Sequence, residues 1–239
     1  MKTVLITGGS RGIGAACVKM FSEAGYSVAF TYKNSEELAL SFSEKYGALA
    51  IRADNSREDE IKRAVDMTLS EYGRIDCLVN NASVSSFSLF QDISLEEWER
   101  TFRVNLTGAF LYSRLTLPHM IKCGRGRIIN ISSVWGLVGS SMEVHYSASK
   151  AALIGMTKAL AKEAGPSGIT VNAIAPGVIN TDMNASLSEE DIARLKDETP
   201  LCRIGEPEEV ASAALFLASD GASFITAEVL NVSGGFVIN

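Results

Sequence analysis

Residues 4–14 read VLITGGSRGIG, a short apolar run followed by a turn rich in glycine. The run predicts a buried strand and the residues after Gly14 predict a helix, so the glycines stand in a strand–turn–helix unit. We expect Gly8 to permit the sharp exit from the strand, Gly12 to let the backbone approach a phosphate, and Gly14 to let helix and strand pack closely. Free N–H groups at the start of the helix would then face the pyrophosphate of a dinucleotide.

Strand-like and helix-like segments alternate along the rest of the chain. The strands are nearly continuous runs of Val, Ile, Leu and Ala, which is typical of strands covered on both faces. This alternation predicts an α/β protein with a doubly wound Rossmann fold, a parallel seven-stranded sheet with helices on both faces. No repeat or Pro/Ser-rich linker interrupts it, so we expect a single domain over residues 1–239. Strands are expected at residues 4–7, 27–32, 49–52, 75–80, 127–132, 170–175 and 228–232, and helices at 13–24, 35–46, 57–72, 95–122 (broken or shifted near 105–108), 146–164 and 206–217.

The end of the second predicted strand bears on which nicotinamide dinucleotide would bind. Sites specific for NAD usually hold the ribose hydroxyls with an acidic residue here, but residues 29–34 read AFTYKN. Lys33 lies there instead and Arg11 lies in the glycine turn, so two cations could converge on a 2′-phosphate. Most loop lysines are merely solvated, but the missing acid and the two cations together favour NADP(H) over NAD(H).

A tyrosine and a lysine lie one helical turn apart in the stretch YSASK, residues 146–150. Tyr146 and Lys150 would share one face of a helix. An ammonium close to a phenol favours the phenolate and would lower a pKa that is about 10 in a free tyrosine, so the phenol could act as a general acid or base. Such a pair alone is usually structural, and its weight depends on the surrounding pattern.

Further motifs follow the glycine turn in a fixed order. Ser133 precedes Tyr146 by thirteen residues. The whole series is residues 7–14, the stretch NNA at 80–82, Asn105, Ser133, Tyr146, Lys150 and the stretch PGVINT at 176–181. In order and spacing it resembles the short-chain dehydrogenase/reductase family over essentially the whole chain. Within that family the chain is most similar to the beta-ketoacyl-acyl-carrier-protein reductases, through residues 11–14, 176–183 and 203–211.

The resemblance implies a catalytic set of Asn105, Ser133, Tyr146 and Lys150. Tyr146 would donate a proton to a carbonyl oxygen while the nicotinamide delivers hydride to the carbon. Ser133 would orient that oxygen and stabilise its developing charge. Lys150 would bind the nicotinamide ribose and lower the pKa of Tyr146, and Asn105 would hold a water that links Lys150 to solvent.

The resemblance also implies a set of cofactor-binding residues. Asp54 would bond the adenine, although a solvated loop aspartate is the plainer alternative. Asn81 and Ala82 would line the adenosine ribose, and Ile179 and Thr181 the nicotinamide end. The full set is Gly8, Ser10, Arg11, Gly12, Ile13, Gly14, Lys33, Asp54, Asn81, Ala82, Tyr146, Lys150, Pro176, Gly177, Ile179 and Thr181.

The sequence departs from the family pattern at a few positions. Ser83 stands where the family has glycine, so backbone freedom beside the cofactor would be reduced. Cys202 and Ala227 stand where close relatives often have glycine. Basic residues that carrier-protein-linked members show before the fifth and sixth strands are sparse in residues 123–127 and 165–168. An acidic carrier protein favours cations around the site, so this last departure weakens the substrate assignment but not the reaction class.

We therefore expect an NADPH-dependent carbonyl reductase that reduces 3-oxoacyl thioesters, bound to acyl-carrier protein, to 3-hydroxyacyl thioesters in fatty acid synthesis. One alternative is an NAD(P)-dependent alcohol, sugar or ketone dehydrogenase of the same family. An alternative of another class is a non-catalytic dinucleotide-binding regulator. Fold-level similarity does not name the substrate, and a small-molecule carbonyl is as compatible with these residues as a carrier-bound one.

Two further segments concern the substrate and assembly. Residues 182–200 are polar, with a short amphipathic piece at 189–195, and would form a lid over the substrate. The helix at 146–164 is small and apolar around much of its circumference, which predicts burial on more than one side. We expect a homodimer packed through this helix, or a homotetramer.

Composition and charge exclude several other classes. The net charge is −6 and no run of five or more like charges occurs, so nothing favours a nucleic-acid partner. No stretch approaches the roughly 18 apolar residues of a membrane span. The four cysteines are scattered without CxxC spacing, which favours free thiols in the cytoplasm over a disulfide framework or a metal site. His145 and His119 lack a partner pattern for a triad or a metal.

Overall fold

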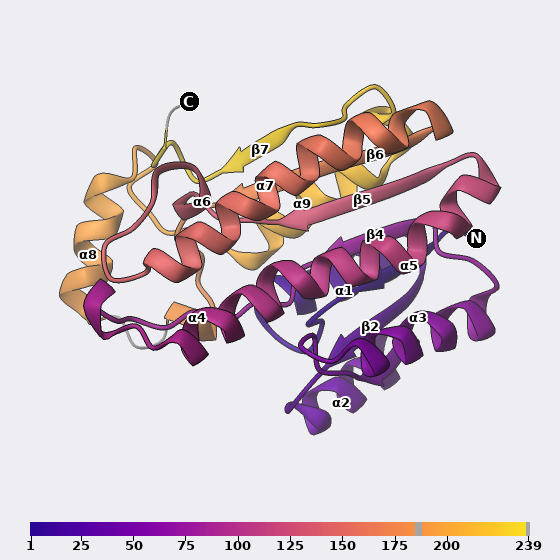
Figure 1. Cartoon of the computed structure of the whole chain (residues 1–239), viewed down its shortest axis with the longest axis horizontal. Helices are drawn as coiled ribbons and strands as arrows, with labels where there is room; N and C mark the ends of the chain where they lie inside the picture. Colours follow the sequence, from indigo (N-terminus) through magenta and orange to yellow (C-terminus); the bar gives the residue numbers. More distant parts are fainter. Residues whose placement is uncertain (185–187, 238–239) are drawn as a thin grey trace.

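A computed structural model describes residues 1–184 and 188–237 of the chain. Seven strands form its sheet: β1 (Thr3–Ile6), β2 (Ser27–Tyr32), β3 (Leu49–Arg52), β4 (Cys77–Asn80), β5 (Gly126–Ile131), β6 (Ile169–Pro176) and β7 (Val229–Val232). Their order is β3-β2-β1-β4-β5-β6-β7, and every neighbouring pair is parallel (Figure 1). The predicted parallel seven-stranded sheet is confirmed. Its order reverses between β1 and β4, which opens a crevice at the carboxyl ends of those strands.

Helices cover both faces of this sheet, as the sequence predicts. One face carries α1 (Gly12–Glu23), α2 (Glu36–Tyr46) and α9 (Pro207–Ala218). The other carries α3 (Glu58–Tyr72), α5 (Gly108–Cys123) and α7 (Val144–Ala164), and Figure 1 shows α5 and α7 crossing in front of the strands. The remaining helical pieces are α4 (Leu95–Phe102), α6 (Trp135–Val138), α8 (Glu189–Glu198), η1 (Phe90–Asp92), η2 (Arg103–Thr107), η3 (Gly165–Ser167), η4 (Asp182–Asn184) and η5 (Asp220–Ala222). Within the described ranges, none of the helices has the length and apolar character needed to cross a membrane.

Successive residues of a strand pack alternately against the helices on one face of the sheet and those on the other. Val4 and Ile6 of β1 pack with α1 and α9, whereas Leu5 between them packs with α3 and α5. All three side chains are fully buried. Strand side chains alternate between faces, so a strand that is apolar at every position needs a layer of helices on each side. This is the physical reason that the continuous apolar runs could be interpreted as central parallel strands.

The predicted elements end within two residues of the observed ones. The expected break in the helix at 95–122 is a π-helical turn, η2, which separates α4 from α5. The short α6 was not predicted, because four residues are too few to show a helical period.

Candidate active site

A cavity of about 840 Å³ opens at the carboxyl end of the sheet, next to the β1–β4 reversal. Ligands of doubly wound folds bind at this position. Of the expected site residues, only Asn105 and Gly14 do not line it. Those that do are Gly8, Ser10, Arg11, Gly12, Ile13, Lys33, Asp54, Asn81, Ala82, Ser133, Tyr146, Lys150, Pro176, Gly177, Ile179 and Thr181.

The glycine turn has the geometry of an anion cradle. Gly8 and Gly12 have φ values of 68° and 52°, a left-handed backbone that favours glycine. A Cβ at Gly14 would lie 2.0 Å from the carbonyl oxygen of Gly8, so only glycine lets the helix start against the strand end. Arg11, the N-cap of α1, makes no side-chain cap, which leaves the first amides of the helix available to an anion. These residues fit a dinucleotide pyrophosphate.

Thr7 and Asn81 fix the turn to the neighbouring strand. Thr7 Oγ1 accepts hydrogen bonds from the backbone N–H groups of Asn81 and Ala82, both at 2.9 Å. Asn81 Nδ2 donates back to the carbonyl oxygens of Thr7 and Gly8, at 2.9 and 3.1 Å. Asn81 therefore holds the glycine turn in place as well as lining the cavity. Its side-chain amide donates to the carbonyl oxygens of the turn.

Lys33 does not face the cavity as a free cation. Its Nζ lies 2.6 Å from Asp54 Oδ2 in an ion pair that joins the ends of β2 and β3. Burial acts to raise the pKa of Asp54, but hydrogen bonds from Lys33 and Ser56 outweigh it and lower that pKa. Arg11, in contrast, is exposed and takes part in none of the ion pairs of residues 1–184 and 188–237. The two expected phosphate-binding cations therefore differ in availability.

The Tyr146 hydroxyl lies in a buried cluster of hydroxyl groups. Burial raises the pKa of Tyr146 to about 12, the nearby hydroxyl groups of Ser133 and Ser83 act to lower it, and the charge of Glu143 raises it. Ser133 Oγ also accepts a hydrogen bond from the Trp135 amide at 3.1 Å, which fixes its direction. Ser83 has no left-handed backbone, so the serine at this glycine position introduces a hydroxyl beside Tyr146 without backbone strain.

The expected acidification of Tyr146 by Lys150 is not seen in this structure. Lys150 Nζ donates to the carbonyl oxygen of Ile131 at 2.8 Å and lies 5.5 Å from the centre of the Tyr146 ring. Burial also lowers the pKa of Lys150 itself, to about 7. Both groups sit in a low-dielectric interior that disfavours their charged forms.

Asn105 belongs to the π-helical turn and lies behind the cavity wall. Its Nδ2 donates to the carbonyl oxygen of Val84 at 2.9 Å and to Ser149 Oγ at 3.1 Å, and its Oδ1 accepts from the Val84 amide at 2.8 Å. The side chain thus ties the loop after β4 to α7. Irregular turns of this kind are frequent at functional sites because they redirect a side chain from the helical pattern.

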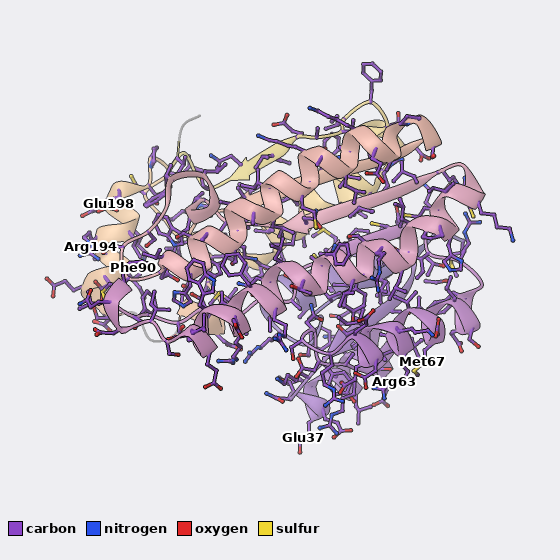
Figure 2. All side chains as sticks on the ribbon, viewed as in Figure 1. Glu37, Arg63, Met67, Phe90, Arg194 and Glu198 are labelled. Carbon is purple, nitrogen blue, oxygen red and sulfur yellow. The ribbon has the colours of Figure 1, made fainter. Side chains whose placement is uncertain are left out.

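The segment after β6 closes over the glycine turn. A Cβ at Gly12 would lie 3.2 Å from Thr181 Cγ2, so Thr181 reaches the start of α1. Ile179 pairs with Gly205 and is buried. The expected lid at 182–200 is described in part, because residues 185–187 lie outside the described residues. Figure 2 shows Arg194 and Glu198 of α8 at the end of the molecule where Phe90 of η1 also lies, the end toward which the strands point.

Two residues beside Tyr146 form contacts that the sequence did not predict. His145 is fully buried, with Nε2 2.9 Å from Ser86 Oγ and 3.8 Å from Glu97 Oε1. Glu143 lines the cavity. Its place one helical turn before Tyr146, on the same face, is the sequence signal that could have identified it. Ser132, the neighbour of Ser133, instead donates to the carbonyl oxygen of Lys150 at 3.0 Å.

Comparison with known proteins agrees with this geometry. Residues 8–237 match a family model described as "Enoyl-(Acyl carrier protein) reductase". The chain is 46% identical to the 3-oxoacyl-[acyl-carrier-protein] reductase FabG of Aquifex aeolicus, over 98% of this chain and 96% of the relative. It is 45% identical to the FabG of Chlamydia trachomatis, with the same coverage. A solved structure of a mutant short-chain dehydrogenase/reductase from Serratia marcescens superposes with a TM-score of 0.93 at 37% identity, covering 98% of this chain and 97% of that one. The chain therefore belongs to the short-chain dehydrogenase/reductase family, oxidoreductases that interconvert alcohol and carbonyl groups with a nicotinamide dinucleotide.

Proposed function

We propose that this chain is an NADPH-dependent reductase that converts 3-oxoacyl thioesters on acyl-carrier protein into 3-hydroxyacyl thioesters for fatty acid synthesis. The observation that carries the proposal is one cavity that joins an anion-binding glycine turn to the buried Tyr146 and Ser133 hydroxyls. The names of full-length relatives supply the substrate.

The cofactor, when bound, supplies the hydride. The amides at the start of α1 would hold its pyrophosphate, with Gly8 and Gly12 allowing close approach. Asp54 would face the adenine, and Asn81 and Ala82 the adenosine ribose. Pro176, Gly177, Ile179 and Thr181 would enclose the nicotinamide end, and Lys150 its ribose.

Tyr146 would supply the proton. Because its pKa is about 12, the phenol keeps its proton at neutral pH and is ready to donate to a carbonyl oxygen. Ser133 would donate a hydrogen bond to the same oxygen as negative charge develops there. Lys150, with a pKa of about 7, can take up and release a proton near neutrality and would return one to the phenolate. Both amide hydrogens of Asn105 are used by the protein, so a relay water would bind at its Oδ1 or at the main chain of η2.

Arg11 and Lys33 in the cavity wall support NADP(H) rather than NAD(H). Arg11 is available for a bidentate bond to a 2′-phosphate. Lys33 would have to share its charge between Asp54 and the phosphate, so Arg11 would carry more of the discrimination.

We further propose that residues 1–239 act as one domain and assemble as a homodimer or homotetramer. One sheet connects the described chain from β1 to β7. The outer side of α7 exposes small residues, and Phe110 on the adjacent α5 is 45% exposed. Packing two such faces together would cover apolar surface that the single chain leaves in water.

The test is NADPH oxidation with a panel of carbonyl compounds. The panel holds acetoacetyl thioesters of carrier protein and coenzyme A, a crotonyl thioester, a diketone and a sugar. We expect the acetoacetyl carrier-protein thioester to be the best substrate, and Tyr146→Phe to lower kcat by about 10²–10⁴-fold. Tyr112→Phe is the matched control, because Tyr112 is a fully buried tyrosine outside the cavity.

Each other outcome identifies a different error. Full activity of Tyr146→Phe would show that another group donates the proton. Reduction of the crotonyl thioester alone would indicate enoyl rather than carbonyl reduction. Cofactor binding without turnover of any compound would indicate a regulatory protein.

A further inference from the structure

Glu143 places an acidic side chain in the cavity wall, one helical turn before Tyr146. The residue is only 7% exposed. Its Oε1 accepts a hydrogen bond from Ser85 Oγ at 2.5 Å. Residues three apart at the start of a helix lie on one side of it, so the proposed proton donor has a carboxylate as its neighbour.

This carboxylate is unfavourable for both the fold and the proposed reaction. Burial raises the pKa of Glu143, and the hydroxyl groups of Ser85 and Ser140 and the charge of His145 act to lower it. Glu143 also raises the pKa of Tyr146 and so opposes the phenolate that proton donation leaves behind. A glutamine could accept the same hydrogen bond from Ser85 without either effect.

No lysine or arginine of residues 1–184 and 188–237 forms an ion pair with Glu143. Arg100 lines the same cavity but is not such a partner. His145 directs its Nε2 toward Ser86 and Glu97. Glu143 therefore has no lysine or arginine partner among the described residues, and a cation that enters the cavity could take that place.

The geometry points to Glu143 as the binding group for a protonated amine carried by the carbonyl substrate. An ammonium here would donate a charge-assisted hydrogen bond to the carboxylate and offset both its burial and its repulsion of the phenolate. The inference rests on the proposed carbonyl reduction at Tyr146, and it adds amino ketones and amino-substituted oxoacyl groups to the carbonyl compounds that the site would take.

A purely structural role for Glu143 is the alternative that the test must separate. Ser85 lies in the loop after β4 and Glu143 is the residue just before α7, so their hydrogen bond could serve only to fix the loop to the start of the helix. Glu143→Gln keeps an acceptor for Ser85 and removes the charge. Glu97→Gln is the matched control, because Glu97 accepts a hydrogen bond from the neighbouring Ser86 but does not line the cavity.

The experiment compares three ketones that differ only in the charge of their end group. They are 5-(dimethylamino)pentan-2-one, its neutral counterpart 6-methylheptan-2-one and the anionic 5-oxohexanoate. A tertiary amine is used because it cannot condense with its own carbonyl. NADPH oxidation gives kcat/KM for each ketone, and calorimetric titration of the complex of enzyme and NADP⁺ gives binding without turnover.

We expect the wild type to prefer the cationic over the neutral ketone by about tenfold or more, and to disfavour the anion. Glu143→Gln should bring the cationic and neutral ketones close to parity, and Glu97→Gln should keep the wild-type ratio. Equal use of the two ketones by the wild type would overturn the inference. So would a Glu143→Gln variant that loses both activities by the same factor, since that is the signature of a structural role.

The outcomes also separate this inference from the proposed function. If acetoacetyl thioesters are reduced while the cationic ketone binds no better than the neutral one, Glu143 has no such role and the proposed function stands. If the cationic ketone binds selectively through Glu143 but no carbonyl is reduced, the proposed function is wrong and the amine site stands.

Discussion

Lys150 is a buried amine, and its titration makes the free energy of unfolding depend on pH in a definite direction. The residue is 2% exposed, and burial lowers its pKa from 10.5 to about 7. Between these values the unfolded chain holds a proton that the folded chain has released, so the free energy of unfolding rises with pH across the window. Relative to Lys150→Met, and without added cofactor, we expect the wild type to gain about 2 kcal/mol between about pH 7 and 9. Urea unfolding at both pH values measures this. The same pH dependence in both proteins would contradict it, and Lys162→Met, at an exposed position of α7, is the control.

Arg11 and Lys33 should contribute unequally to cofactor choice. Arg11→Ala should raise KM for NADPH by about tenfold or more, because it removes a charged hydrogen bond to the 2′-phosphate, and should change KM for NADH little. Lys33→Ala should have a smaller effect of the same kind, since Asp54 already neutralises that lysine. Steady-state kinetics with both cofactors measures the difference. Equal changes for NADPH and NADH would show that neither residue contacts the phosphate.

At this scale the sequence predicted which residues meet but not how their charges pair. The strand–turn–helix order and the motif spacing suffice to bring Gly12, Tyr146 and Thr181 into one cavity. The Lys33–Asp54 ion pair could not be predicted from the sequence. Lys33 Nζ and Asp54 Oδ2 come within 2.6 Å only when β2 and β3 take their register. The raised pKa of Tyr146 was equally inaccessible, since burial decides it and spacing does not report burial.

Among the connecting elements of the described chain, three residues with a side chain take a backbone that favours glycine: Met142, Cys202 and Ala227. Ala227 has φ 62° and Cys202 has φ 53°, a left-handed backbone that suits the glycine that the family resemblance leads us to expect at both positions. A left-handed residue with a Cβ is strained by about 1–2 kcal/mol, and the greater chain entropy of glycine offsets part of that. Ala227→Gly should therefore raise the free energy of unfolding by about 0.5–1 kcal/mol. Thermal unfolding measures it, with Ala211→Gly inside α9 as a control that should destabilise by more than about 1 kcal/mol, because it adds chain entropy and removes a fully buried methyl group. A loss of stability in both variants would refute the strain argument.

Helices and strands could be predicted where the segment is long enough to show a periodic spacing of apolar residues. The apolar runs gave the strands, and glycines gave the ends of α2 and α3, where Gly47 and Gly73 take the left-handed C-cap conformation. The loop from β4 to α4 and the short α6 carry no period, and they contain the side chains that shape the substrate end of the cavity, such as Ser85 and Trp135. The part of the site that determines the substrate is therefore the part that the pattern predicts least.

At the scale of the whole molecule, we expect the exposed surface of α7 to form the interface between subunits. Ala151, Gly155 and Ala159 are exposed and spaced four residues apart, so they form one stripe along the helix. A Cβ at Gly155 would meet open space, and arginine is a better helix former than glycine, so Gly155→Arg should fold as a single chain. It would place a long charged side chain in the proposed interface. We expect sedimentation velocity to give a multiple of 25.6 kDa for the wild type and a single chain for Gly155→Arg. Glu37→Arg changes charge on α2, away from α7 in Figure 2, and should leave the assembly intact. An oligomer that survives Gly155→Arg would place the interface on another surface.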